Sequence, residues 1–219
     1  MATKKAYHHG NLREALVAAA LKEIAKSGPD GFSLREVARR AGVSAPAVYR
    51  HFADKDQLLA AVAAECSQRI GAAMEKAVAA APPDPLEQFR ARGIAYVQFA
   101  VSHPEHFRAM SLPKFWDRLP KDQLAEADAD NADQREQILR GQQEGLIAGF
   151  DVETILMFAT AAVHGLAQFI VEGKLGDVDE KRATELANKM TAFLAAGLEP
   201  RNEPFEDALS GVKLKGRTR

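Results

Sequence analysis

Apolar residues recur at spacings of three and four along almost the whole chain, and alternation at period two is rare. The first spacing places apolar side chains on one face of an α-helix, whereas alternation is typical of a β-strand. The first such stripe joins Leu12, Leu16, Ala20 and Ile24. We therefore expect an all-α fold whose first helix begins near Asn11.

Two short helices are predicted next, at residues 33–41 and 44–51, with Gly42 in the tight turn between them. Ser33 stands three residues before Glu36, which is the spacing of a capping box. Glycine supplies the backbone freedom that such a turn needs. A pair of short helices joined in this way is predicted to be a helix-turn-helix.

Predicted N-cap residues and helix-breaking prolines mark the ends of the remaining helices. Ser44 and Asp54 are predicted N-caps, and Asp54 opens a long Ala-rich helix that ends before the proline cluster at 82–85. Residues 126–136 are acidic and fit either a solvated helix face or a loop. The remaining predicted helices lie at 86–102, 104–111, 121–147, 151–174 and 179–197.

Charge is distributed unevenly along the chain. The 219 residues are 47% hydrophobic and 27% charged, which is enough apolar material for a core, and the net charge is −1. Residues 1–60 hold ten Lys and Arg against six Asp and Glu, whereas residues 61–219 hold nineteen against twenty-four. A basic head on an acidic body indicates DNA contact at one end of the molecule.

Several classes of protein are disfavoured. The single Cys66 cannot form an internal disulfide, which fits a reducing cytoplasm. No run of about 18 apolar residues predicts a membrane span. A Gly-rich phosphate loop, a nucleophile elbow and metal-ligand spacing are all missing from the sequence. We expect a cytoplasmic protein that is not an enzyme and that has no cofactor, no metal site and no membrane partner.

The second short helix would present its outer face to a DNA major groove. Arg50 can bond both acceptors of a guanine edge, and the alanines can touch a thymine methyl. Other polar side chains suit backbone phosphates. The predicted DNA contacts are Ser33, Arg35, Ser44, Ala45, Pro46, Ala47, Tyr49, Arg50, His51 and Lys55. The alternative is that this basic helix pair is an ordinary solvated surface.

Three stretches of this region, at 32–44, 48–52 and 54–59, strongly resemble the N-terminal domain of TetR-type transcription regulators. The resemblance implies a DNA-binding head, a connecting fourth helix, a helical ligand-binding body and dimerisation through the last two long helices. By position, Tyr49 and His51 match DNA contacts of the family, and Lys55 matches its phosphate-contacting lysine.

Two further stretches are similar to a TetR subgroup named for a Trp-His-Gly signature. They are residues 7–13 and the sequence from Val163 to Leu166. The chain departs from that signature because its only tryptophan is Trp116.

The last two helices carry wide apolar stripes that favour a dimer interface across a two-fold axis. Small residues permit close approach of helices, although these stripes could equally fill the core of one protomer. The predicted interface residues are Ala162, Gly165, Leu166, Phe169, Leu186, Met190, Phe193 and Leu194.

Aromatic residues are concentrated between the proline cluster and these helices, and such residues line apolar ligand pockets. Core packing is the competing explanation for each of them, and a buried, satisfied histidine is the competing explanation for His164. The predicted ligand contacts are Phe89, Tyr96, Phe99, Phe107, Met110, Phe115, Trp116, Gln143 and His164.

The resulting hypothesis divides the chain into a DNA-binding domain (1–56), an effector-binding and dimerisation domain (57–200) and a flexible tail (201–219). Its expected partners are double-stranded operator DNA, a second copy of the chain and a largely apolar small-molecule effector. By its resemblance the regulator is expected to be a repressor. The alternative is a helical adaptor or ligand-binding protein without sequence-specific DNA binding.

Overall fold

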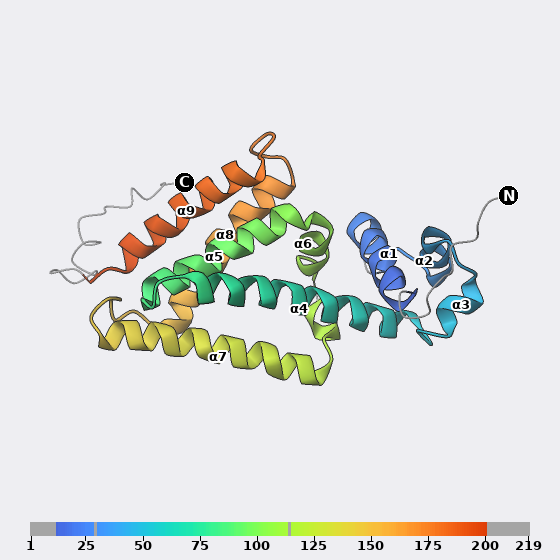
Figure 1. Cartoon of the computed structure of the whole chain (residues 1–219), viewed down its shortest axis with the longest axis horizontal. Coiled ribbons are helices and arrows are strands. Elements are labelled where there is room, and N and C mark those ends of the chain that lie inside the picture. The colour runs from blue at the N-terminus through green and yellow to red at the C-terminus, as the bar shows by residue number, and fades with distance from the viewer. Residues whose placement is uncertain (1–11, 29, 114, 201–219) are drawn as a thin grey trace, which may run out of the picture.

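The computed structural model describes residues 12–28, 30–113 and 115–200, and within them the side chains of all but residues 123 and 126–130. These residues form helices and turns without any β-strand, which confirms the predicted all-α fold (Figure 1). The predicted tail at 201–219 and the residue Asn11 lie outside the described residues. The helices are α1 (Leu12–Ser27), α2 (Leu34–Ala41), α3 (Ala45–Tyr49), α4 (Lys55–Ala80), α5 (Pro85–Ser102), α6 (Pro104–Met110), the short 3₁₀ helix η1 (Trp116–Arg118), α7 (Lys121–Gln143), α8 (Val152–Val171) and α9 (Glu180–Leu198).

Helix starts follow the local sequence closely. A carboxylate oxygen of Asp54 accepts a hydrogen bond from the backbone N–H of Gln57 at 2.8 Å, as a capping aspartate should. Helix α7 is continuous through the acidic stretch at 126–136. It ends at Gln143, earlier than predicted, because Gly145 adopts a left-handed conformation with φ of 71°.

The molecule is elongated, with α1, α2 and α3 at one end and α5 to α9 at the other (Figure 1). We call these two parts the head and the body. Helix α4 starts beside the head and runs into the body without a break, so it belongs to both. The predicted boundary at residues 56 and 57 falls in the first turn of this helix.

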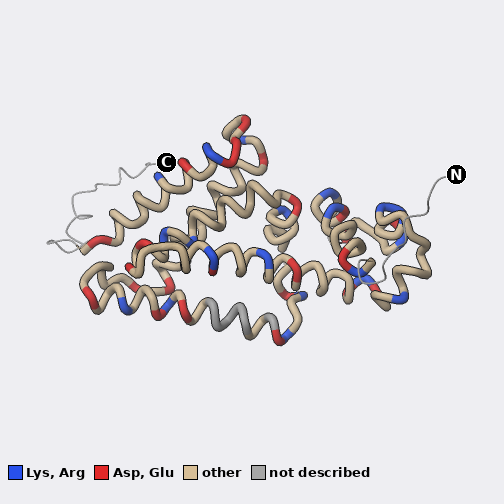
Figure 2. Tube along the Cα trace, in the orientation of Figure 1, with Lys and Arg blue, Asp and Glu red and all other residues tan. Residues whose placement is uncertain are grey.

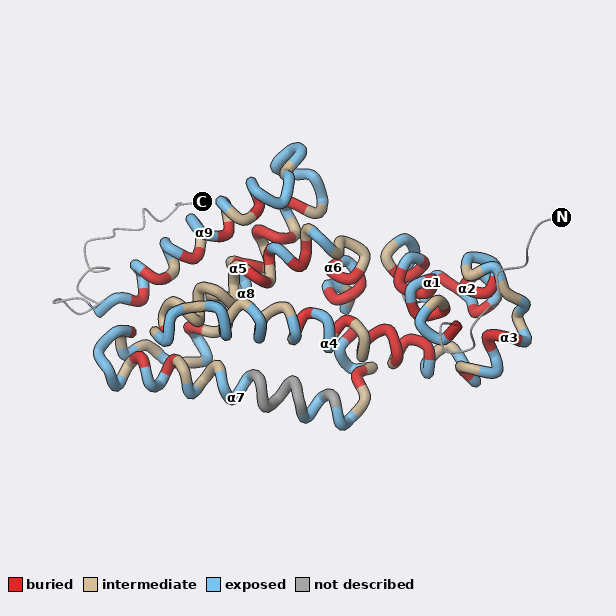
Figure 3. The backbone as a smooth tube through the Cα atoms, viewed as in Figure 1, coloured by how far each residue is buried: buried red, intermediate tan, exposed pale blue. Residues whose placement is uncertain are grey.

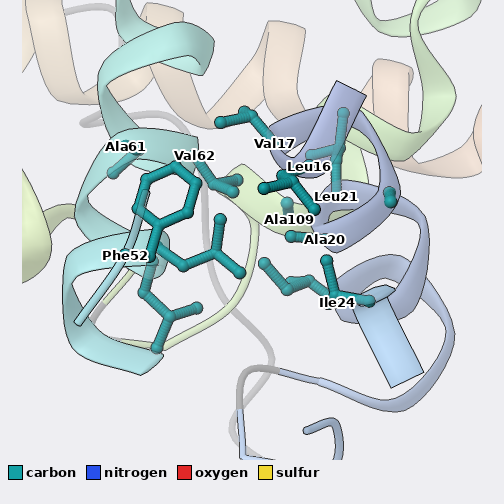
Figure 4. Close-up of a cluster of buried hydrophobic side chains, with 14 of the residues drawn as sticks. Leu16, Val17, Ala20, Leu21, Ile24, Phe52, Ala61, Val62 and Ala109 are labelled. Carbon is teal, nitrogen blue, oxygen red and sulfur yellow. The ribbon is translucent and has the colours of Figure 1, made fainter. Parts of the chain in front are cut away.

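A single buried cluster joins the head to the body. It contains the predicted stripe of α1, which is buried at every position, together with the head end of α4 (Figure 3). Ala109 of α6 packs into the same cluster beside Leu16 and Ile24 of α1 and Val62 of α4 (Figure 4). Since interiors are close-packed, a shift of α6 must be felt by α1.

The body is built around α5, which packs against α4 on one side and against α8 and α9 on the other. A Cβ atom at Gly93 would lie 3.2 Å from side-chain atoms of Val163 and Thr191, so the glycine allows a close approach of these three helices. Helix α8 has a mean hydropathy of 1.7 over its most apolar window. It is therefore long and apolar enough to cross a membrane by length and composition alone.

Candidate nucleic-acid interface and internal cavity

The turn between α2 and α3 is fixed by backbone and side-chain hydrogen bonds. Ser33 and Glu36 form the predicted capping box, in which the Ser33 N–H donates to the Glu36 carboxylate at 2.7 Å. This bond and that from the Ser33 hydroxyl hold the pKa of Glu36 below its usual value. At the other end Gly42 has a φ of 70°, and the N–H of Val43 donates to the carbonyl of Ala38 at 2.9 Å. This is a Schellman motif, and it sets the angle at which α3 leaves α2.

Helix α1 packs against α2 and holds it in place. Glu23 of α1 is buried, and its carboxylate accepts a hydrogen bond from Nε of Arg40 in α2 at 2.6 Å. Val48 of α3 is fully buried and packs into the head core. The outer surface of α2 and α3 is thereby left to solvent at the free end of the molecule (Figure 1).

This outer surface carries most of the predicted DNA contacts. Tyr49 is 53% exposed, and Ser33, Arg35, Ser44, Pro46 and Arg50 are also exposed. Ala45 and His51 are half-buried. The described residues place no carboxylate in an ion pair with Arg35 or Arg50, so both guanidinium groups are available to a polyanion. Figure 2 shows Lys and Arg positions on the head, at the end of the molecule where α2 and α3 lie.

One predicted contact, Ala47, needs correction, whereas the contact of Lys55 stays a prediction. Ala47 is only 6% exposed, because the five-residue helix α3 directs both Ala47 and Val48 into the head core, and the prediction that Ala47 touches a base is wrong. Lys55 is half-buried: its Nζ donates to the carbonyl of Asp30 at 3.1 Å and lies 4.6 Å from the ring centre of Phe32. Ser44, predicted as an N-cap, makes no side-chain capping bond.

Two adjoining cavities, each partly open to solvent, lie in the body. The smaller, of about 150 Å³, is enclosed mainly by α5, α8 and α9, and the larger, of about 490 Å³, lies between α4, α6, η1, α7 and α8. They share six lining residues, namely Met74, Arg92, Tyr96, Asn131, Gln134 and Thr160. Together they have a size that suits a small organic ligand.

A polar pair stands at the junction of the cavities. The Tyr96 hydroxyl lies 2.8 Å from Nδ1 of His164, which joins α5 to α8. Burial raises the pKa of Tyr96 to about 12, so the phenol stays neutral at physiological pH. The Tyr96–His164 pair can therefore act as a hydrogen-bonding element in a largely apolar space.

A second polar cluster joins α4 to α6. Nε2 of His106 lies 3.5 Å from a Glu65 carboxylate oxygen, which also accepts a hydrogen bond from Arg69 at 2.9 Å. The His106 contact is the main cause of the lowered pKa of Glu65. Nearby, burial raises the pKa of Cys66 to about 12 and keeps it a thiol.

Comparisons with known proteins agree with this geometry. Residues 16–62 match the model of bacterial regulatory proteins of the tetR family, and residues 89–194 match that of the tetracyclin repressor-like C-terminal domain. The chain belongs to the TetR family of bacterial regulatory proteins. An uncharacterized HTH-type transcriptional regulator of Haemophilus influenzae is 44% identical over 59 residues, which are 26% of this chain and 29% of the relative.

Solved structures share the whole fold. A TetR family transcription regulator from Marinobacter aquaeolei superposes with a TM-score of 0.71 at 21% identity, over 88% of this chain and 97% of that one. A protein of unknown function from a Rhodococcus species is 31% identical, with a TM-score of 0.69 over 90% of this chain and 100% of that one. These likenesses show that the chain shares its overall fold with both structures.

The cavities of this TetR chain include some of the predicted ligand contacts and exclude others. Phe89, Tyr96, Met110, Trp116 and His164 line them. The other predicted residues do not line these two cavities: three aromatic residues are buried in the core and one glutamine is exposed at the end of α7, namely Phe99, Phe107, Phe115 and Gln143.

Several polar residues that line the cavities were not among the ligand contacts predicted from the sequence. Arg92 falls on the same face of α5 as Phe89 and Tyr96, at helical spacings of three and four, so that signal was present. No pattern in the sequence pointed to Gln134 or Thr160, because they come to the cavity only when α7 and α8 pack against α5.

The structure places some of the predicted dimer residues on the outside of α8 and α9 and others on the inner side. Phe169 and Phe193 are exposed, and Ala162 and Gly165 are half-buried on the outside of α8. The others face inward: one is buried in the body core, two pack against it and one lines the smaller cavity, namely Leu166, Leu186, Met190 and Leu194. For Leu166 the prediction is wrong, because it packs towards α5 and α9.

Proposed function

We propose that this TetR-family protein binds an inverted-repeat operator as a homodimer, represses transcription there and is released by a small-molecule effector. The observation that carries the proposal is the exposed outer surface of α2 and α3, held by the Gly42 turn at the free end of the molecule. Arg50 supplies the donors for a guanine edge, and Ser33, Arg35 and Tyr49 suit the flanking phosphates.

The dimer is proposed to form through α8 and α9. Phe193 is 81% exposed, Met157 is 67% exposed and Phe158 is 62% exposed, which is unusual for large apolar side chains on one part of a surface. Figure 2 shows an uncharged stretch towards the C-terminal end of α9. Covering these side chains with a second copy also accounts for the high hydropathy of α8 without a membrane. We propose a cytoplasmic location, because the operator DNA is there.

Effector release is supported by the packing of the cavity wall. Met110 of α6 and Leu119 line the larger cavity, and both belong to the buried cluster that holds α1 of the head. A ligand that displaces either side chain must shift that cluster or be excluded. In a dimer this displacement changes the separation of the two α3 helices, which must be about 34–36 Å to enter successive major grooves.

Operator and effector then weaken each other's binding by the same factor, because linkage is reciprocal. The effector needs only to bind one arrangement of head and body better than the other. No enzymatic reaction is assigned to the chain.

The DNA interface is tested with Arg50→Ala and Lys55→Ala against an inverted-repeat duplex bound by the wild type. Arg50→Ala should cost about 1–3 kcal/mol and relax the preference at one base pair of each half-site. Lys55→Ala should weaken binding to all sequences and reduce the slope of log affinity against log salt by about 2, because the dimer loses one phosphate contact in each protomer.

Lys76 provides the matched control for this experiment. It is exposed on α4, about 30 Å along the helix from Lys55 at 1.5 Å per residue, so Lys76→Ala should leave affinity and salt slope unchanged. Unchanged DNA binding by both head variants would remove the proposed interface and leave a helical adaptor as the explanation of the fold.

A further inference from the structure

The two body cavities alternate in character along their length. At the junction, five of the six shared lining residues are polar, and only Met74 is apolar. The smaller chamber is closed by Phe89, Ala159, Val163 and Leu194. The larger chamber is closed by Ile70, Met110, Trp116, Leu119 and Leu124. The residues that line one cavity alone also include Arg90 and Thr191 in the smaller, and Ser67 and His164 in the larger. A polar belt thus separates two mainly apolar chambers of unequal size.

The belt is rich in hydrogen-bond donors. Asn131, Gln134 and Thr160 make no side-chain hydrogen bond with any other described side chain or backbone group, although each can donate. The described lining residues include neither Asp nor Glu. Gln134 is half-buried, whereas Asn131 and Thr160 are exposed and can also bond to water. A ligand that shields these donors from water must bring an acceptor to them or leave them unpaired.

The Tyr96–His164 pair fits the same role. When Nδ1 of His164 carries the proton it donates to the Tyr96 oxygen, and the phenolic proton is then free to point at a ligand. The high pKa of Tyr96 keeps that proton in place at neutral pH.

We propose that the effector is an elongated, mainly apolar molecule with an internal hydrogen-bond acceptor, such as a carbonyl, that lies at the Tyr96, Gln134 and Thr160 belt. The shorter apolar arm fills the chamber at Phe89 and Leu194, and the longer arm fills the chamber at Trp116. This inference rests on the proposed function, because it specifies the effector that the regulator responds to.

The position of the acceptor along the ligand is the testable part. Butyl octyl ketone and methyl undecyl ketone have the same molecular formula and nearly the same free energy of transfer out of water. The carbonyl lies well inside the carbon chain of the first and next to the end of the chain of the second. Trp116 is the single tryptophan of the protein and lines the larger chamber, so its fluorescence reports binding directly. We expect butyl octyl ketone to bind the full-length protein about threefold to tenfold more tightly, the effect of one net hydrogen bond.

Variants assign that preference to the belt. Tyr96→Phe and Gln134→Leu should each reduce the ratio of the two dissociation constants towards one, since they remove donors without emptying the chambers. Gln143→Leu, an exposed position on the same helix as Gln134, is the matched control and should keep the wild-type ratio. A circular dichroism melt of each variant shows whether its fold is retained.

Equal affinity for the two ketones, or a preference that survives both belt variants, would overturn this assignment of the effector. DNA binding is measured separately and without ligand, so the outcomes can be told apart. If neither ketone binds while the wild type still shows DNA binding that depends on Arg50, the ligand class is wrong and the DNA-binding function stands.

Discussion

A negative charge introduced at Phe193 is the sharpest test of how the two heads are held together. The ring of Phe193 is 81% exposed on α9 and would be covered by the partner protomer. Removing roughly 150 Å² of apolar surface from water at about 25 cal/mol per Å² contributes about 4 kcal/mol for each protomer. Phe193→Glu forfeits this contribution and places two carboxylates near the two-fold axis.

The loss is large enough to measure without ambiguity. The substitution is present in both protomers, so the dimer loses about 8 kcal/mol; since about 1.4 kcal/mol is a tenfold change, its dissociation constant should rise by roughly 10⁵- to 10⁶-fold. Sedimentation equilibrium over a range of protein concentrations should show monomers of Phe193→Glu where the wild type is dimeric. The same variant should bind an inverted repeat poorly, because its heads are no longer joined.

Leu139→Glu is the control for the substitution itself. Leu139 is an exposed apolar residue of α7 and not of α8 or α9, the helices of the proposed interface, so its variant should remain dimeric. Both positions are exposed in one protomer, and neither change should alter the helical signal. A Phe193→Glu protein with the wild-type dimer constant would refute the proposed interface.

Two further predictions concern the head and its junction with the body. Gly42→Ala should destabilise the protein by about 1–2 kcal/mol through its left-handed φ alone, since a Cβ there meets nothing within 4 Å, and Gly42→Asn should cost less; equal melting temperatures for both variants would contradict this reasoning. Glu65 has a lowered pKa, so its ionised form adds stability at neutral pH that is lost as pH falls below about 4.5. Urea unfolding should therefore show Glu65→Gln less stable than the wild type at about pH 7, with the difference shrinking in acid; a constant difference would argue against a role for the Glu65 charge.

Local features of the fold could be predicted from the sequence because their causes are local. A capping box needs only Ser33 and Glu36 three residues apart, and a left-handed helix end needs only Gly42. The same holds for Asp54, whose side chain caps the first turn that follows it. These signals located the head and its turn correctly.

The inner and outer faces of the body could not be predicted in the same way. Phe107 and Trp116 are both aromatic residues in the same segment, yet the first is buried in the core and the second lines the cavity. Which of them meets open space depends on how α6 and η1 pack against α4 and α8, and periodicity does not report this. The prediction for Ala47 was wrong for a similar reason. The angle at which the five-residue helix α3 packs against α2 decides which side of α3 faces the core.

The most direct test of the central claim is selection of DNA by the full-length protein from a pool of duplexes with randomised sequence. A dimer that carries two exposed α3 helices predicts an enriched inverted repeat whose half-site centres lie one helical turn, or a whole number of turns, apart. Arg50→Ala should recover the same spacing with one position in each half-site relaxed. Recovery of no common sequence, or of a single half-site without symmetry, would contradict the account of the head and the dimer.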